Sequence, residues 1–341
     1  MDTSSVLVIY TGGTIGMKQN AKTKTLVPFD FSEIEKEVPE LKKFKYKLDI
    51  HSFKNPIDSS NIDPSFWSNI ATVIKNNYDL YNGFVILHGT DTMSYSASAL
   101  SFMLENLNKP VIFTGSQLPI DSVRNDGKEN ILSAIEIAAS QQNGKPKVPE
   151  VCIFFENKLF RGNRTTKHSA ENFNAFRSYN YPALAESGVE IKYNSPAIAK
   201  PKSNKVLKIH TKMDTSVIGL KIFPGINCDF VDKILNIKGL KGIVIETFGS
   251  GNAPASKKFL SKFKAAIDNG LIALNISQCQ VGSVEMERYE TGILLKKTGV
   301  VCGKDITFEA AITKLSFLLA NNKAVTVIKE KLQKSLRGEI S

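Results

Sequence analysis

Threonine hydroxyls and a carboxylate stand in two short segments that follow apolar runs. The first segment is Thr11-Gly12-Gly13-Thr14 and the second is His88-Gly89-Thr90-Asp91-Thr92. A threonine hydroxyl is a weak nucleophile at its ordinary pKa and needs a base beside it. Asp91 is one candidate for that base, and a lysine that loses its proton in a dry site is another. These residue types therefore permit nucleophilic catalysis by a threonine.

The glycines of the first segment favour a functional loop over a plain turn. Three glycines interleaved with threonines between Thr11 and Gly16 let the backbone turn sharply and approach a ligand. The exposed N–H groups of such a loop can bind an anion or an oxyanion. The segment matches neither G-x-G-x-x-G nor G-x-x-x-x-G-K-[ST], so a phosphate-binding loop is disfavoured.

The other polar residues have structural alternatives. Residues 90–92 can cap the helix that follows them, and Thr92 is the best placed to do so. A lone histidine at a strand end, such as His88, is more often structural than catalytic. On composition alone, the segment from Arg161 to Lys167 is a solvated basic loop, although its lysine can also serve as the base beside Asp91.

Alternating strands and helices are expected to position these residues. Such alternation indicates parallel βα units and a doubly wound sheet, which binds ligands at the carboxyl ends of its strands. The expected strands span residues 6–10, 83–87, 110–113 and 151–155, and the expected helices span residues 95–107 and 130–139.

A change of composition near residue 200 predicts two α/β domains. Residues 194–212 contain two prolines, five lysines and no acidic residue, which is typical of a linker, and apolar runs resume after them. The larger N-terminal domain is expected to hold the doubly wound, mostly parallel sheet, and the smaller C-terminal domain is also α/β. The expected boundaries are 1–190 for the first domain, 191–211 for the linker and 212–341 for the second domain.

The net charge of +11 first suggests a nucleic-acid or membrane-surface binder. However, the chain has 38 lysines against only six arginines, and bidentate reading of bases and phosphates prefers arginine. We therefore expect a solvated basic surface and no nucleic-acid partner. The four cysteines form no C-x-x-C pair, so we expect neither a metal site nor a disulfide framework. The absence of a secretory signal and of an 18-residue apolar run predicts a cytoplasmic location without a membrane partner.

Six segments together resemble the bacterial-type L-asparaginase family, and specifically its cytoplasmic type I branch. They occur in the order and spacing of that family over nearly the whole chain. The segments are TGGTIG at 11–16, DSS at 58–60, HGTDTM at 88–93, TGSQLP at 114–119, RGNRTTK at 161–167 and GSGNAP at 249–254.

The resemblance implies a reaction and a set of residue roles. The family hydrolyses the side-chain amide of asparagine to aspartate and ammonia, using two threonines and no metal or cofactor. By position in the motifs, Thr14 is the nucleophile that forms an acyl-enzyme. Thr90, Asp91 and Lys167 form a second polar triad that activates the water or the nucleophile and relays protons.

The resemblance also implies the substrate-binding residues. Ser59 and Asp91 bind the α-carboxylate and α-amino groups, with Asp58 and Ser60 in the same loop. Thr90 and Ser116 are further candidates for substrate binding. A small zwitterion needs one fixed anion for its ammonium group and neutral donors for its carboxylate, and this set supplies both.

The family assembles as homodimers or homotetramers, which are dimers of dimers. The C-terminal domain of one chain closes the site of its neighbour, and Gly249–Pro254 is the segment expected to approach it, with Asn252 as a contact.

Two positions depart from the family pattern. Many members carry a tyrosine in the loop after TGGTIG, where this chain has Leu26. Some type I enzymes bind activating asparagine through an arginine where this chain has Glu246, and a carboxylate cannot replace a guanidinium there, although Cys279 of that neighbourhood is present. Two alternatives stay open: a mixed glutaminase-asparaginase, since one methylene discriminates by only about 1–3 kcal/mol, and a non-catalytic amino-acid-binding protein.

Overall fold

The apolar runs form the centre of an eight-stranded sheet. The computed structural model describes residues 4–19, 23, 26–28, 34–201 and 205–341. Four of the strands pair in parallel and are buried along nearly all of their length, as expected for strands covered on both faces. They are β1 (Ser5–Tyr10), β5 (Gly83–Leu87), β7 (Val111–Thr114) and β10 (Val151–Phe155).

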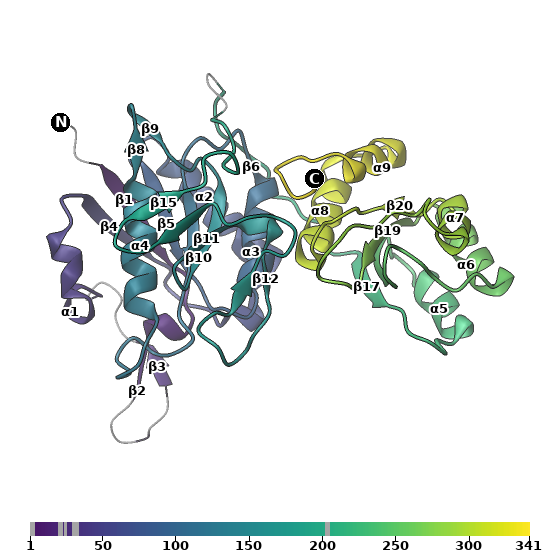
Figure 1. Ribbon diagram of the computed structural model, residues 1–341, viewed down its shortest axis with the longest axis horizontal. Helices are drawn as coiled ribbons and strands as arrows, with labels where there is room; N and C mark the ends of the chain where they lie inside the picture. The colour runs from purple at the N-terminus through teal and green to yellow at the C-terminus, as the bar shows by residue number, and fades with distance from the viewer. Residues whose placement is uncertain (1–3, 20–22, 24–25, 29–33, 202–204) are drawn as a thin grey trace. The chain divides into compact units, whose positions relative to one another are not determined.

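The order of the strands makes the sheet doubly wound. From β1 the chain first reaches β4 (Lys47–Ser52), which pairs in parallel on one side, and then returns to β5 on the other side. Beyond β10 the sheet continues with three antiparallel strands, β11 (Lys158–Arg161), β14 (Ala185–Ser187) and β15 (Ile191–Tyr193). The full order is β15-β14-β11-β10-β7-β5-β1-β4 (Figure 1). The predicted mostly parallel sheet is confirmed.

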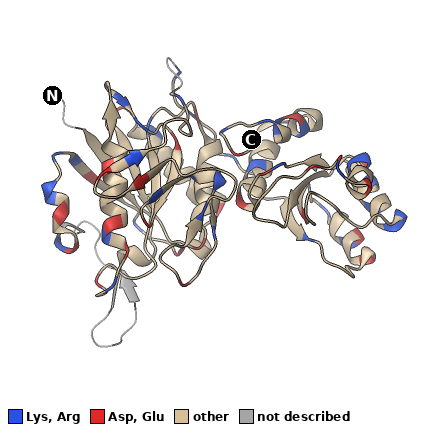
Figure 2. Cartoon of the chain, viewed as in Figure 1, with Lys and Arg blue, Asp and Glu red and all other residues tan. Residues whose placement is uncertain are grey.

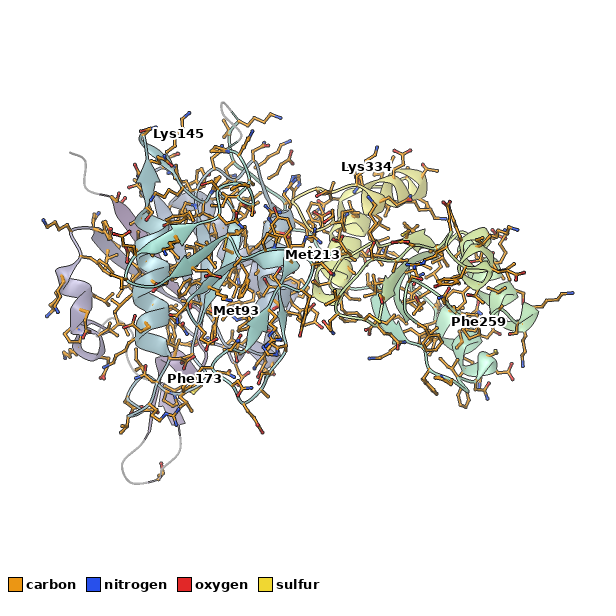
Figure 3. All side chains as sticks on the ribbon, viewed as in Figure 1. Met93, Lys145, Phe173, Met213, Phe259 and Lys334 are labelled. Carbon is orange, nitrogen blue, oxygen red and sulfur yellow. The ribbon has the colours of Figure 1, made fainter. Side chains whose placement is uncertain are left out.

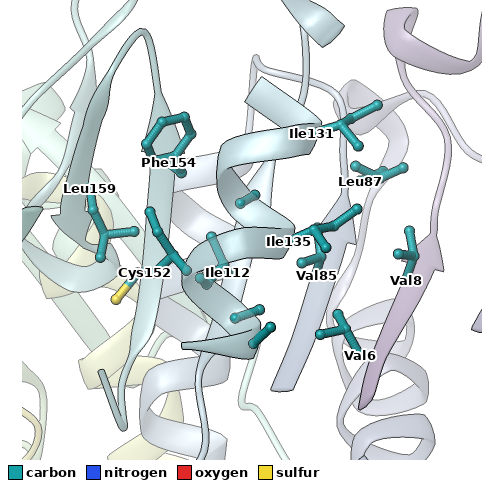
Figure 4. Close-up of a cluster of buried hydrophobic side chains, with 14 of the residues drawn as sticks. Val6, Val8, Val85, Leu87, Ile112, Ile131, Ile135, Cys152, Phe154 and Leu159 are labelled. Carbon is teal, nitrogen blue, oxygen red and sulfur yellow. The ribbon is translucent and has the colours of Figure 1, made fainter. Parts of the chain in front are cut away.

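Two helices hold the central strands. Helix α4 (Gly127–Ala139) places Ile131 and Ile135 against alternate side chains of the strands, among them Val85 and Leu87 (Figure 4). Helix α3 (Met93–Met103) is buried on almost every side. The remaining elements before residue 212 are η1 (Thr14–Gly16), β2 (Met17–Gln19), β3 (Leu26–Pro28), α1 (Ile34–Glu37), η3 (Pro39–Lys43), η4 (Ser59–Asn61), α2 (Pro64–Asn76), β6 (Leu104–Glu105), β8 (Gln141–Gln142), β9 (Lys145–Pro146), η5 (Gly162–Arg164), β12 (Thr166–Lys167), β13 (Phe176–Arg177) and β16 (Lys208–Ile209).

The chain divides into two compact units, Met1–Thr211 and Lys212–Ser341. Two parts of the segment expected to be a linker, 191–211, are paired within the first unit: β15 extends the large sheet, and β16 pairs with β6. The same pairing ends α3 at Met103, so the helix predicted to reach residue 107 is too long. After β6, Asn106 adopts a positive φ of 61° and turns the chain away.

The second unit is a four-stranded parallel sheet with helices. Its order is β17 (Val217–Lys221), β18 (Gly242–Thr247), β19 (Ile272–Ser277) and β20 (Val301–Cys302). Phe259 and Phe263 pack against each other within its core with tilted rings, and Phe259 is marked in Figure 3. The predicted smaller α/β domain is confirmed. Its helices are α5 (Cys228–Leu235), α6 (Lys257–Asp268), α7 (Glu290–Lys297), α8 (Phe308–Asn321) and α9 (Val325–Gln333).

The basic residues are spread over both units. Figure 2 shows lysines and arginines on helices, strands and loops, interleaved with acidic residues. Several form partly exposed ion pairs, such as Lys262 with Asp232 at 2.9 Å, and such pairs contribute little to stability. The excess charge thus belongs to no single element.

Candidate active site

The loops after β1 and β5 start side by side at the carboxyl edge of the large sheet. β1 pairs with β4 on one side and with β5 on the other, so the chain leaves β1 and β5 in opposite winding directions. Thr11 joins the two strand ends, because its N–H and its hydroxyl both donate to the carbonyl of Leu87, at 3.0 and 2.8 Å. Open α/β sheets bind ligands where the strand order reverses in this way. Thr14 and Thr90 therefore lie on the two loops that border this point.

Two glycines bring the Thr14 loop against its neighbours. A Cβ on Gly12 would lie 2.2 Å from the carbonyl oxygen of Ile57, and a Cβ on Gly13 would lie 2.5 Å from the backbone nitrogen of Gly89. Both residues also have positive φ, at 127° and 90°, which glycine adopts without strain. The loop that carries Thr14, which is half-buried at the start of η1, is thus pressed against the Asp58 loop and the Thr90 loop.

Thr90, Asp91 and Lys167 form one hydrogen-bonded group. Lys167 Nζ donates to Thr90 Oγ1 at 2.8 Å and to Asp91 Oδ1 at 2.7 Å. The lysine side chain is 17% exposed and the aspartate side chain is 66% exposed. The lysine is therefore shielded, while the carboxylate keeps a face open to a ligand.

The segment that delivers Lys167 is buried, so the solvated-loop interpretation of residues 161–167 is wrong. Arg161 is buried and pairs with Glu150 at 2.5 Å, and Arg164 is only 2% exposed. η5 packs closely on α3, since a Cβ on Gly162 would lie 2.9 Å from the Cβ of Ala97. This packing fixes the start of the short ribbon of β12 and β13 on which Lys167 lies.

The Asp58–Ser60 loop packs against the Thr90 loop and is hydrogen-bonded to it. Ser59 is 3% exposed, and a Cβ on Gly89 would lie 2.6 Å from its hydroxyl oxygen. Thr92 stands at the N-cap of α3, but its side chain does not cap the helix as predicted: the hydroxyl donates to the carbonyl of Ser59 at 2.6 Å. Asp58 instead caps η4 by accepting bonds from the N–H and hydroxyl of Ser60, and these bonds lower the pKa of Asp58.

The loop after β7 adds a residue that the sequence did not single out. Ser116 is buried and its hydroxyl donates to the carbonyl of Leu118 at 2.6 Å, within its own loop. Gln117 is the new contact, because the Thr90 hydroxyl donates to its Oε1 at 3.1 Å. It stands inside the TGSQLP segment, but nothing in the sequence distinguishes its amide from its neighbours. Met93, which begins α3, and Phe173, which lies between β12 and β13, are landmarks for this region in Figure 3.

Comparison with known proteins places the whole chain in one family. The sequence pattern described as Asparaginase, N-terminal, matches residues 5–199, and that described as Glutaminase/Asparaginase C-terminal domain matches residues 216–332. The chain belongs to the asparaginase family. It is 42% identical to L-asparaginase 1 of Escherichia coli K12, over 100% of this chain and 99% of that protein. It is also 39% identical to the 60 kDa lysophospholipase of Mus musculus, over 98% of this chain and 62% of that protein.

Solved asparaginase structures share the fold. L-asparaginase I from Vibrio cholerae matches with a TM-score of 0.90 and 39% identity, over 99% of each chain. L-asparaginase from Thermococcus kodakarensis matches with a TM-score of 0.89 and 29% identity, again over 99% of each chain. The resemblance found in the sequence, including its type I branch, is confirmed.

The residues that depart from the family pattern lie in different parts of the chain. The side chain of Leu26 is outside the described residues. Glu246 lies near the carboxyl end of β18 and Cys279 is exposed beyond β19. Asn252 closes a turn with Phe248, and its side chain accepts a bond from Thr291 at 2.9 Å.

Two kinds of feature are absent from the described part of the chain. It holds no group of three histidine, cysteine, aspartate or glutamate residues arranged to bind a metal ion. It also has no helix long and apolar enough to cross a bilayer.

His88 is a buried, neutral histidine that hydrogen-bonds to Gly89 and Ser96. The Trp67 indole N–H donates to Ser96 Oγ at 2.8 Å, and Ser96 Oγ lies 2.8 Å from His88 Nε2. His88 Nδ1 lies 2.6 Å from the carbonyl of Gly89 and must donate to it, since a carbonyl only accepts. Nε2 is therefore the acceptor of the Ser96 hydroxyl. Complete burial lowers the pKa of His88 from 6.5 to about 4, so the structural interpretation of His88 is favoured.

We expect His88 to make the protein less stable in acid. Because its pKa is lower in the folded than in the unfolded state, its contribution is complete above pH 6.5 and is lost as the pH falls to about 4. The loss corresponds to about 3 kcal/mol of unfolding free energy. Urea unfolding at pH 7 and at pH 4 should show this difference, and His88→Gln should remove it. His51→Gln, at a partly exposed histidine, is the control; an unchanged pH dependence in His88→Gln would contradict the assignment.

Proposed function

We propose that this chain is an L-asparagine amidohydrolase, which converts L-asparagine and water to L-aspartate and ammonia. The observation that carries the proposal is the hydrogen-bonded group of Lys167, Thr90 and Asp91, because the loop of Thr90 and Asp91 contacts the Thr14 loop at Gly13 and Gly89. The chain's place in the asparaginase family supports it. The reaction needs no cofactor.

The proposed reaction has two steps. The Thr14 hydroxyl attacks the side-chain amide carbon, its proton passes to the departing nitrogen, and ammonia leaves behind an aspartyl ester on Thr14. Water then attacks the ester, helped by Thr90 and Lys167, and releases aspartate. Backbone N–H groups around Gly13 and Thr90 are the proposed donors to the oxyanion that forms in each step.

The proposed binding set separates charged from neutral contacts. The exposed carboxylate of Asp91 binds the α-ammonium group of the substrate, and Ser59 donates to its α-carboxylate. The side chains of Asp58, Ser60 and Ser116 form hydrogen bonds within their own loops, so we assign these residues to holding the shape of the loops around the substrate.

A second activity on glutamine has one observation in its favour, since the family pattern that matches residues 216–332 names both glutaminase and asparaginase. Ammonia release from L-asparagine, D-asparagine and L-glutamine separates the possibilities. We expect turnover of L-asparagine well above that of the other two. Comparable turnover of L-glutamine would indicate the mixed enzyme, and binding without ammonia release would indicate a non-catalytic amino-acid-binding protein.

We expect the rate to follow a hyperbolic curve with asparagine concentration. Glu246 stands where some type I enzymes use an arginine to hold activating asparagine, and a carboxylate repels the substrate carboxylate. Initial rates over a concentration series through KM test this expectation. A clearly sigmoidal curve would contradict it. The cooperativity of the unaltered protein is then compared with that of the Glu246→Arg variant.

We further propose a cytoplasmic homodimer or homotetramer, with Gly249–Pro254 of one chain approaching the site of its neighbour. The proposed domain roles are catalysis for residues 1–190 and completion of the neighbouring site for 212–341, while the expected linker 191–211 contributes β15 and β16 to the first unit. Family membership supports this assembly.

A further inference from the structure

Gln117 and Lys167 both hydrogen-bond to the hydroxyl of the second threonine, Thr90. The hydroxyl of Thr90 has one hydrogen and two lone pairs. One lone pair accepts from Lys167 Nζ at 2.8 Å, and the hydrogen is donated to Gln117 Oε1 at 3.1 Å. One lone pair of Thr90 Oγ1 then remains as an acceptor for a reacting hydroxyl or water.

The orientation of the Gln117 amide is set by its other partner. Gln117 Nε2 lies 3.2 Å from the carbonyl oxygen of Asn172, which can only accept. A flipped amide would place two oxygens against each other, so Oε1 must face Thr90. The hydrogen bond to the carbonyl of Asn172 thus fixes the orientation of the Gln117 amide. The amide oxygen in turn sets the direction of the Thr90 hydroxyl hydrogen.

The backbone of Gln117 is held by the partly buried carboxylate of Asp126. Its N–H donates to both oxygens of Asp126, at 3.1 and 3.0 Å, and Asp126 also accepts from the side-chain amide of Asn130 at 3.3 Å. Asn130 in turn donates to the carbonyl of Gly115 at 3.0 Å. The loop that carries Gln117 is therefore fixed by several hydrogen bonds. This limits how far the side chain of Gln117 can move with Thr90.

We propose that Gln117 is a positioning residue, which holds the Thr90 hydroxyl in the rotation that leaves its free lone pair for the reacting group. The inference rests on the proposed function and acts through Thr90. Its effect belongs to the reaction rather than to binding, so it changes kcat more than KM.

Gln117→Met tests the inference by removing both hydrogen-bonding groups at similar length. We expect kcat for L-asparagine to fall about tenfold, the value of one lost hydrogen bond of ordinary strength, and KM to stay within about twofold. Leu118→Met is the matched control, because Leu118 is the next residue of the same loop, is exposed, and is expected to leave kcat unchanged.

The outcomes separate this inference from the proposed function. If the unaltered protein releases ammonia but Gln117→Met keeps its kcat, or changes only KM or the thermal midpoint, Gln117 merely joins two loops and the inference is wrong. If the unaltered protein releases no ammonia from L-asparagine, the proposed function fails and the inference fails with it.

Discussion

Replacing Thr14 with alanine is expected to abolish the release of ammonia from L-asparagine, with kcat lowered about 10³-fold or more. The reason is that no acyl-enzyme can form without the hydroxyl, whereas the loop itself does not depend on it. The sharp turn is imposed by Gly12 and Gly13, which contact Ile57 and Gly89 through their backbones. Ammonia release under saturating asparagine measures the loss of catalysis, and the thermal midpoint measures whether the fold is retained.

Thr14→Ser is the matched control for this prediction, because it keeps a hydroxyl in nearly the same place. We expect it to retain measurable turnover and the same thermal midpoint. Near-normal activity of Thr14→Ala would exclude Thr14 as the nucleophile and would direct attention to Thr90.

Replacing Lys167 with methionine should lower kcat by about 10²- to 10⁴-fold, the range typical of a lost acid–base group. Methionine keeps the length and the apolar stem of the lysine but loses both bonds, to Thr90 and to Asp91. The Asp91 carboxylate would then lack the lysine as its cationic partner. KM should therefore rise, but by a smaller factor than kcat falls. Steady-state rates over a series of asparagine concentrations give both constants.

Lys145→Met is the control for the charge alone, since Lys145 is an exposed lysine in β9. It should leave kcat and KM unchanged. A Lys167→Met enzyme that keeps most of its kcat would remove the lysine from the reaction and leave it a purely structural role.

Local patterns predicted the central strands of the large sheet and the loops that follow them, because the relevant signals lie within a few residues. An apolar run followed by glycine and threonine identifies a strand end and its loop, as in residues 6–14 and 83–92. The roles of those residues came from the family resemblance, and the sheet order then explained why the two loops meet. That order depends on pairing between β1 and β5, more than 70 residues apart, which no local pattern records.

The errors came from partners that are distant in the sequence. The composition of residues 161–167 indicated that Arg161 and Arg164 are solvated. Instead both are buried, by pairing of Arg161 with Glu150 and by the packing of η5 on α3. The end of α3 was misplaced because β16, about 100 residues later, pairs with β6. Gln117 was missed for the same reason: its significance comes from Thr90 and from the carbonyl of Asn172.

The most direct test of the account is to identify the covalent intermediate. The enzyme is mixed with excess L-asparagine, quenched in acid during turnover, and analysed by peptide mass spectrometry. The account predicts an aspartyl ester on the peptide that contains Thr14, located at Thr14 itself and absent from Thr14→Ala. An ester on Thr90, or full activity with no modified Thr14 in any quenched sample, would contradict it.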